Sequence, residues 1–299
     1  MQVRLRRNSG ECPEERLFMK KNLGSISRRS FLKSSGITAS GLLIPSKALA
    51  EKSVTGTLQV WSCGGLAEAF VPANKAFERN TGVRISYTGA FAAALGKSLL
   101  GSATTEVFAP RVITLSKKLK DEGKMLWYKP LCFTRYIIAV PEDNPAGVTS
   151  VKDLAKPDMR VVLSFGSSAP GGEATKVLLK KAGVLEGVEE NAVFNGDCVQ
   201  RTTRMLINGK ADAAIVEQRI TCLPEFRGKL DMIPIDEEYF PPPPMTFTIG
   251  LMKWAENPEV ARKYIDFILS TEGQKCFEDA GFIPAASDEG RRLSKKYGV

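Results

Sequence analysis

The sequence contains no histidine. Histidine is the side chain whose ordinary pKa lies nearest neutral pH, so its absence excludes His-based catalysis, the Ser-His-Asp triad and His-ligated metal sites. The chain also lacks a C-x-x-C pair, which excludes a zinc ribbon and a thioredoxin-type motif. No spacing of Cys, Lys or paired carboxylates supports an enzyme. We therefore expect a protein that is not an enzyme.

A long hydrophobic run is also missing, because no apolar stretch reaches the ~18 residues that a membrane-spanning helix needs. Among the 299 residues, the formal charge of +9 is unevenly distributed. Residues 1–50 hold 10 of the 42 Lys and Arg residues and 3 of the 33 Asp and Glu residues, which leaves 32 basic and 30 acidic side chains. The basic excess therefore belongs to the N-terminal segment, and we expect no nucleic-acid partner.

The N-terminal segment contains an export signal. Residues 27–33, SRRSFLK, match the twin-arginine pattern S-R-R-x-F-L-K. A mildly apolar segment from Gly36 to Ile44 follows, and Ala48-Leu49-Ala50 matches an A-x-A cleavage site. The sequence predicts a leader over residues 1–50, cleavage after Ala50 and a periplasmic location. Proteins on this route are exported already folded.

The exported part retains five cysteines: Cys63, Cys132, Cys198, Cys222 and Cys276. This number is odd, and the predicted compartment is oxidising. At least one thiol must therefore be free, paired with another molecule, or bound to a ligand.

The stretch from Leu58 to Phe77 has the pattern of a strand, a turn and a helix. Leu58 to Trp61 predicts a buried strand, Gly64 and Gly65 allow a tight turn, and apolar residues from Leu66 to Phe77 recur at helical spacing. Such a corner directs backbone N–H groups toward an anion or polar ligand. An ordinary strand–helix corner with a buried cysteine is the alternative. Further strands alternate with helices along the chain, which predicts an α/β fold with mainly parallel sheets.

The order of these segments resembles the periplasmic solute-binding proteins of ABC importers, in particular the molybdate/tungstate-binding group with the two-lobed type II fold. The resemblance covers nearly all of residues 57–285. It rests on segments distributed along the chain: 63–70 (CGGLAEAF), 77–83 (FERNTGV), 106–109 (EVFA), 138–145 (IAVPEDNP), 151–155 (VKDLA), 208–216 (NGKADAAIV), 268–274 (ILSTEGQ) and 281–282 (GF).

The resemblance implies two α/β lobes joined by two crossings, near Ile137–Pro141 and near Met245–Ile249. Lobe one would comprise residues 51–138 and 246–299, and lobe two residues 139–245. The ligand would lie in the cleft, and the lobes would close on it about the hinge. The resemblance also implies a monomer that works with an ABC permease and ATPase.

The binding residues of the family carry over only in part. The first serine of the family falls on Gly65, beside Cys63 and Gly64, and the second falls on Phe91 or Ala92. Backbone donors fall on Gly171, which Gly172 follows, and on Cys198. The tyrosine falls on Glu217. The hydroxyl donors are absent and a carboxylate is present, so we expect tetrahedral oxyanions such as molybdate to bind poorly.

Two thiols stand where the family has neutral donors. We expect Cys63 and Cys198 to face each other across the cleft and to hold a thiophilic ion with Glu217, with Cys132 or Cys222 as a possible further ligand. Copper(I), zinc(II) and trivalent arsenic or antimony suit such ligands. Helix N-termini would lower the pKa of both thiols. In the alternative interpretation the cysteines are buried apolar residues or form disulfides, Cys63–Cys198 or Cys132–Cys222.

Three functions remain open. The preferred one is an extracytoplasmic solute-binding protein that delivers a small inorganic ligand to an ABC importer, either a molybdate-type oxyanion or, preferably, a thiophilic metal or metalloid. No resident cofactor is expected, since the bound ion is the transported ligand. The alternatives are a binding protein that signals to a membrane histidine kinase, and a periplasmic enzyme or redox protein that uses cysteine.

The export signal gives the first testable prediction. Replacing Arg28 and Arg29 together by lysine should trap the full-length precursor in the cytoplasm, because the twin-arginine pattern requires both arginines. Cell fractionation followed by immunoblotting measures this. Normal export of the double variant, with cleavage after Ala50, would contradict the twin-arginine assignment.

Overall fold

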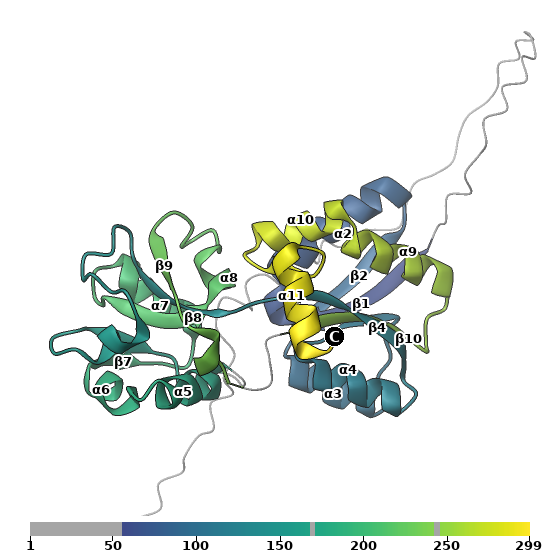
Figure 1. The fold of residues 1–299 in the computed structure, drawn as a ribbon. Coiled ribbons are helices and arrows are strands. Elements are labelled where there is room, and N and C mark those ends of the chain that lie inside the picture. The colour runs from purple at the N-terminus through teal and green to yellow at the C-terminus, as the bar shows by residue number, and fades with distance from the viewer. Residues whose placement is uncertain (1–55, 168–170, 242–245) are drawn as a thin grey trace, which may run out of the picture. The chain divides into compact units, whose positions relative to one another are not determined.

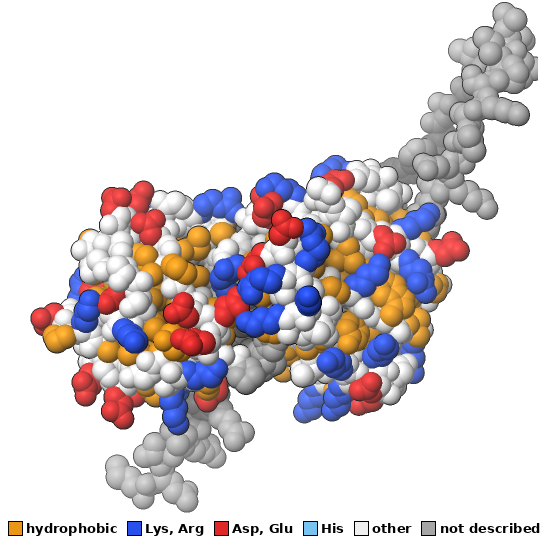
Figure 2. Space-filling view, in the orientation of Figure 1, with side chains coloured by type: hydrophobic (Ala, Val, Ile, Leu, Met, Phe, Trp, Pro, Cys, Tyr) orange, Lys and Arg blue, Asp and Glu red, His pale blue; other side chains and the backbone are white. Residues whose placement is uncertain are grey.

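The computed structural model describes residues 56–167, 171–241 and 246–299. The predicted leader and the cleavage site after Ala50 lie outside these residues. Within the described ranges, no helix combines the length and the apolar character that crossing a membrane requires. Figure 2 shows basic and acidic side chains interspersed on one face, consistent with the nearly balanced charge of residues 51–299.

The first of two sheets has six strands in the order β11-β4-β10-β3-β1-β2. β1 is parallel to both β2 and β3, whereas β10 is antiparallel to β3 and β4. Seven helices belong to this part of the described chain (Figure 1). The strands are β1 Thr57–Cys63, β2 Arg84–Ala90, β3 Val107–Ala109, β4 Met125–Phe133, β10 Thr246–Met252 and β11 Ile283–Pro284, and the helices are η1 Gly64–Leu66, α2 Ala67–Thr81, α3 Ala92–Leu100, α4 Ile113–Asp121, α9 Pro258–Leu269, α10 Thr271–Asp279 and α11 Asp288–Tyr297.

The second sheet has five strands in the order β7-β6-β8-β5-β9. β6 is parallel to β7 and β8, and β5 is antiparallel to β8 and β9. The strands are β5 Tyr136–Pro141, β6 Val161–Leu163, β7 Ala192–Asn195, β8 Ala213–Glu217 and β9 Leu230–Pro234, and the helices are η2 Val151–Ala155, α5 Gly171–Lys181, α6 Leu185–Glu190, α7 Val199–Ile207, α8 Gln218–Thr221 and η3 Glu237–Tyr239. The expected two-lobed α/β fold is confirmed, with each lobe built on one sheet. The expectation of mainly parallel sheets was wrong, because both sheets are mixed.

The crossings between the sheets define the lobes. β4 pairs with β10 as far as Phe133, and β5 joins the second sheet from Tyr136 onward. The first crossing is therefore Thr134–Arg135, earlier in the chain than the expected Ile137–Pro141, because all of β5 makes its ladder bonds in the second sheet. We call residues 56–133 and 246–299 the first lobe and residues 136–241 the second lobe. The other expected crossing, near Met245–Ile249, begins outside the described residues, and from Thr246 onward the chain forms β10 of the first sheet.

Each lobe has its own hydrophobic core. In the first lobe, Leu58 and Val60 of β1 alternate with more exposed neighbours and pack against Phe70 and Phe77 of α2. In the second lobe, α5 and α6 cover one face of the sheet, and α7 and α8 cover the other. The period-2 pattern of strands and the helical spacing of α2 produce this packing directly.

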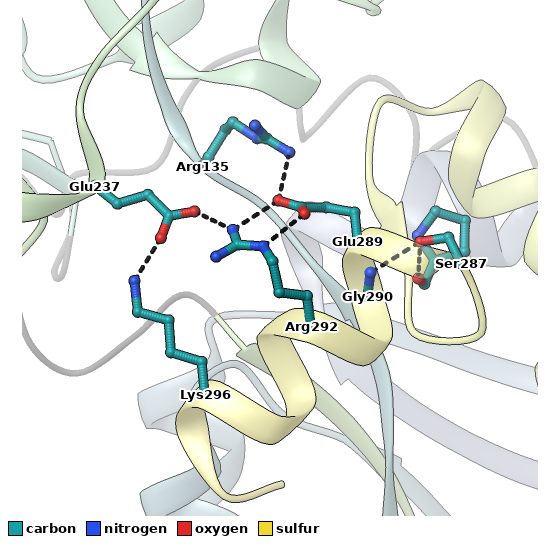
Figure 3. Close-up of polar contacts among 8 residues, drawn as sticks. Arg135, Glu237, Ser287, Glu289, Gly290, Arg292 and Lys296 are labelled. Carbon is teal, nitrogen blue, oxygen red and sulfur yellow. Dashed lines mark hydrogen bonds and ion pairs between the residues drawn. The ribbon is translucent and has the colours of Figure 1, made fainter.

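A network of ion pairs connects the lobes beside the first crossing (Figure 3). Glu289 of α11 binds both Arg135 of the crossing and Arg292. Arg292 and Lys296 of α11 both bind Glu237 of η3 in the second lobe. These side chains are roughly a third to a half exposed, so solvent screens the pairs and each contributes little to stability.

A buried carboxylate gives a prediction about stability. Glu106, which precedes β3, accepts hydrogen bonds from the backbone N–H of Gln59 in β1 (2.8 Å) and of Glu256 after β10 (3.1 Å). We expect Glu106→Ala to lower the free energy of unfolding by about 1–3 kcal/mol, because two amides lose their acceptor. Urea denaturation measures this change.

The matched control for this prediction is Glu256→Ala. The Glu256 side chain is exposed, and the substitution keeps the backbone N–H that Glu106 binds. The control should change stability by less than about 0.5 kcal/mol. Equal losses in the two variants would contradict a specific role for the Glu106 carboxylate.

Candidate functional site

The corner after β1 forms as the sequence predicts, with β1 leading through η1 into α2. Cys63 ends β1 and is buried in the first-lobe core near Cys132. Burial raises the pKa of the Cys63 thiol and outweighs the opposing effect of Arg111. The backbone N–H of Gly65 at the start of η1 lowers this pKa as expected, but burial outweighs it, so the Cys63 thiol is neutral at neutral pH.

Gly65 of this corner allows a close approach from the second lobe. A Cβ atom at Gly65 would lie 3.0 Å from the terminal nitrogen Nη2 of Arg219. This is tighter than ordinary contact, so a serine at this position would require the Arg219 guanidinium to move. A guanidinium therefore occupies the space beside the position where the family has a serine.

A buried cluster of Arg111, Glu217 and Arg219 joins the two lobes, and we call it the Arg–Glu–Arg cluster. Arg111 follows β3 in the first lobe, Glu217 ends β8 in the second, and Arg219 lies in α8. Arg111 Nη2 lies 2.6 Å from Glu217 Oε1, and Arg219 Nε lies 2.9 Å from Glu217 Oε2. The three side chains are only 11%, 10% and 17% exposed, respectively.

The two arginines determine the charge state of Glu217. Burial alone would raise the pKa of this carboxyl group, but the charges of Arg111 and Arg219 and their hydrogen bonds lower it to about 2. Glu217 is therefore ionised at neutral pH and its charge is compensated. The sequence predicts this carboxylate but not the two arginines that compensate its charge, and the cluster as a whole has a net charge of +1.

The backbone next to Arg111 is strained. The next residue, Val112, has φ 64° and ψ 130°, a conformation that a β-branched residue rarely adopts. Its N–H donates to the carbonyl of Thr246 (2.9 Å), the first residue of β10. Strain of this kind costs about 1–3 kcal/mol and persists where the surrounding structure imposes it, often at ligand-binding positions.

Most other predicted site residues lie at helix termini. Phe91 precedes α3 and is 47% exposed, and Ala92 is the first residue of α3. Gly171 and Gly172 begin α5. Cys198 is the N-cap of α7, and its carbonyl accepts from Thr202 N–H.

The predicted three-ligand metal site is not assembled in this structure. Among the described residues, no group of three or more His, Cys, Asp and Glu side chains could hold a metal ion. Glu217 is engaged by two guanidinium groups, Cys132 is enclosed in the core, and Cys222 packs against Gly281 of the first lobe. The alternative of disulfides is not realised either, since none of the five cysteines forms one.

Sequence reasoning missed both arginines of the cluster. Two other arginines of the chain are engaged elsewhere: Arg135 binds Glu289 beside the hinge, and Arg201 binds Asp197 on the surface. Arg219 could have been found, because it lies two residues after the position that was assigned to the ligand. Arg111 could not have been found from the residues around it in the sequence, because only the tertiary fold brings its side chain to Glu217.

Comparison with known sequences places the chain among extracellular binding proteins. A "Putative binding protein" of Haemophilus influenzae is 27% identical over 149 residues, which cover 50% of this chain and 59% of that protein. The Bacillus subtilis protein YvgL, named an ABC transporter substrate-binding lipoprotein, is 23% identical over 78% of this chain and 87% of its own length. These relatives are named as binding proteins rather than enzymes.

Solved structures show the same fold. The substrate-binding domain of a protein described as a molybdenum ABC transporter of Clostridium difficile superposes with a TM-score of 0.67 at 21% identity, covering 77% of this chain and 99% of that one. The molybdate-binding protein of Azotobacter vinelandii gives 0.59 at 16% identity over 76% and 98% of the two chains. The ferric binding protein of Campylobacter jejuni gives 0.59 at 20% identity over 81% and 91%. The family model for bacterial extracellular solute-binding proteins matches residues 58–283, and the chain belongs to this family.

Proposed function

We propose that this protein is a periplasmic solute-binding protein that delivers a small oxyanion to the permease and ATPase of an ABC importer. The observation that supports the anion is the buried Arg–Glu–Arg cluster between the lobes, with a net charge of +1. Guanidinium groups present planar sets of N–H donors that match the oxygens of carboxylates, phosphates and related anions.

The same charges disfavour a cation. A metal ion near Glu217 would also lie near the guanidinium groups of Arg111 and Arg219, whose repulsion is large where water is excluded. The neutral Cys63 thiol would have to lose its proton against the cost of burial. Glu68 acts on Arg219 from the surface, but it is exposed and its charge is screened by solvent. We therefore favour the oxyanion over the thiophilic ion.

The arrangement of the cluster across both lobes gives ligand binding a way to drive closure. Arg111 belongs to the first lobe and Arg219 to the second, so an anion that contacts both binds the closed state better than the open one. The protein would then act as a monomer that closes about a hinge at Thr134–Arg135. Export through the twin-arginine signal of residues 27–33 would place it in the periplasm, where an importer receives its solute.

Direct titration tests the proposed function. We expect the purified mature protein to bind molybdate, sulfate or phosphate with a dissociation constant in the micromolar range or below, about −8 kcal/mol or stronger. Isothermal titration calorimetry measures the affinity. Small-angle scattering with the bound anion should show a smaller radius of gyration, because the lobes close.

Arsenite, zinc(II) and ferric ion serve as the competing probes in the same titration. Tight binding of any of these by the reduced protein, without binding of the three anions, would contradict the anion proposal and restore the thiophilic or metal interpretation. An unchanged scattering profile at saturating anion would contradict closure of the lobes.

Glu217 gives a second prediction about selectivity. We expect Glu217→Gln to bind a dianion such as molybdate or sulfate about ten-fold more tightly than wild type does. The substitution raises the net charge of the cluster from +1 to +2, and the ligand then gains the attraction of guanidinium groups that the carboxylate no longer neutralises. Without ligand, the variant should be less stable by about 3–5 kcal/mol, because two buried guanidinium groups lose their partner.

The control is Glu225→Gln, which removes the charge of a half-exposed carboxylate that binds Arg204 on the surface of the second lobe. It should alter stability by less than about 1 kcal/mol and leave anion affinity unchanged. If Glu217→Gln binds dianions no better than this control, the Arg–Glu–Arg cluster is not the anion site.

A further inference from the structure

The hydroxyl group of Tyr136 is buried beside the Arg–Glu–Arg cluster without a hydrogen-bond partner among the described residues. Tyr136 begins β5 and is only 2% exposed. A buried hydroxyl that lacks a partner destabilises the folded protein, whereas phenylalanine would fill the same space without that cost. The hydroxyl therefore calls for an explanation other than stability.

The register of the second sheet fixes the position of this residue. Tyr136 pairs directly with Glu217 across the antiparallel β5–β8 ladder, so the two side chains are neighbours on one face. Its ring also packs edge-on against Phe240, with the ring centroids 5.9 Å apart. These two constraints keep the hydroxyl near the cluster.

The electrostatic surroundings define what the hydroxyl can do. Burial raises the pKa of Tyr136, and the charge of Glu217 adds to this effect, with Arg111 opposing it. The phenol is therefore neutral at physiological pH. A neutral hydroxyl next to guanidinium groups can donate a hydrogen bond to an anion without adding negative charge of its own.

We propose that Tyr136 is a ligand-binding residue whose hydroxyl donates a hydrogen bond to the anion held between Arg111 and Arg219. This inference rests on the proposed function and specifies its ligand as an anion with an unprotonated oxygen beside the cluster. Tyr136 lies next to the hinge crossing, so the bond also links ligand binding to the strand that leads out of the hinge.

The test compares Tyr136→Phe with Tyr264→Phe, a matched removal of a buried hydroxyl. Tyr264 lies in the first-lobe core, where its hydroxyl donates to Asn74 Oδ1 (2.5 Å). The thermal midpoint of each ligand-free protein is measured first. Tyr136→Phe should keep or raise the midpoint, because it removes an unpaired hydroxyl. Tyr264→Phe should lower the midpoint, because it leaves Asn74 without its donor.

Calorimetric titration with molybdate, sulfate and phosphate is the second measurement. For the anion that wild type binds most tightly, Tyr136→Phe should weaken affinity about ten-fold or more, as expected for a lost hydrogen bond to a charged group. Tyr264→Phe should retain the wild-type affinity within about two-fold. These opposite effects of the two variants on stability and on binding separate a ligand contact from a structural role.

Two results would overturn the inference while the proposed function stands. The first is an unchanged anion affinity in Tyr136→Phe. The second is a loss of thermal midpoint in Tyr136→Phe as large as that in Tyr264→Phe, which would show that the hydroxyl is paired without ligand. If wild type binds none of the three anions, the proposed function fails and the inference about Tyr136 fails with it.

Discussion

The ion pairs of Glu217 with Arg111 and Arg219 are the interaction on which the interlobe region depends. An ionised carboxylate at this depth would be very costly alone, and two guanidinium groups offset that cost. One guanidinium comes from each lobe. The ion pair between Arg111 and Glu217 therefore both stabilises the buried charge and joins the two lobes. The ion-pair network of Glu237, Glu289 and Arg292 beside the hinge is far more exposed, and water and salt weaken it.

The fold was largely predictable because it depends on local patterns. The strand, Gly-Gly turn and helix from Leu58 to Phe77 formed as expected, and so did the alternation of strands and helices that builds both sheets. The hinge was misplaced by a few residues. The apolar run Ile137–Val140 predicts a buried strand, but only the register with Val216 and Pro234 shows that all of it belongs to the second sheet.

The site was less predictable because its contacts join residues far apart in the chain. The resemblance directs attention to Glu217, but the charge of that residue depends on Arg111, more than one hundred positions earlier. The charge state of the cysteines also depends on tertiary structure. Their positions suggested ligands, whereas burial raises the pKa of Cys63 and of Cys132 and favours the neutral thiols. The burial of a thiol depends on the tertiary structure, so it cannot be predicted from the spacing of residues in the sequence.

Glu217, which the resemblance aligns with a tyrosine of the family, also constrains its neighbours. A carboxylate at the end of β8 requires compensating charge, which Arg111 and Arg219 supply, and Gly65 leaves room for the second guanidinium. The hydroxyl lost at this position has a counterpart one strand away, because Tyr136 is the cross-strand partner of Glu217. In the sequence, Gly65 and Glu217 look like two separate losses of a hydroxyl donor. They are coupled because Arg219 contacts both positions. In the proposed site, charged donors would stand where the resemblance places neutral ones.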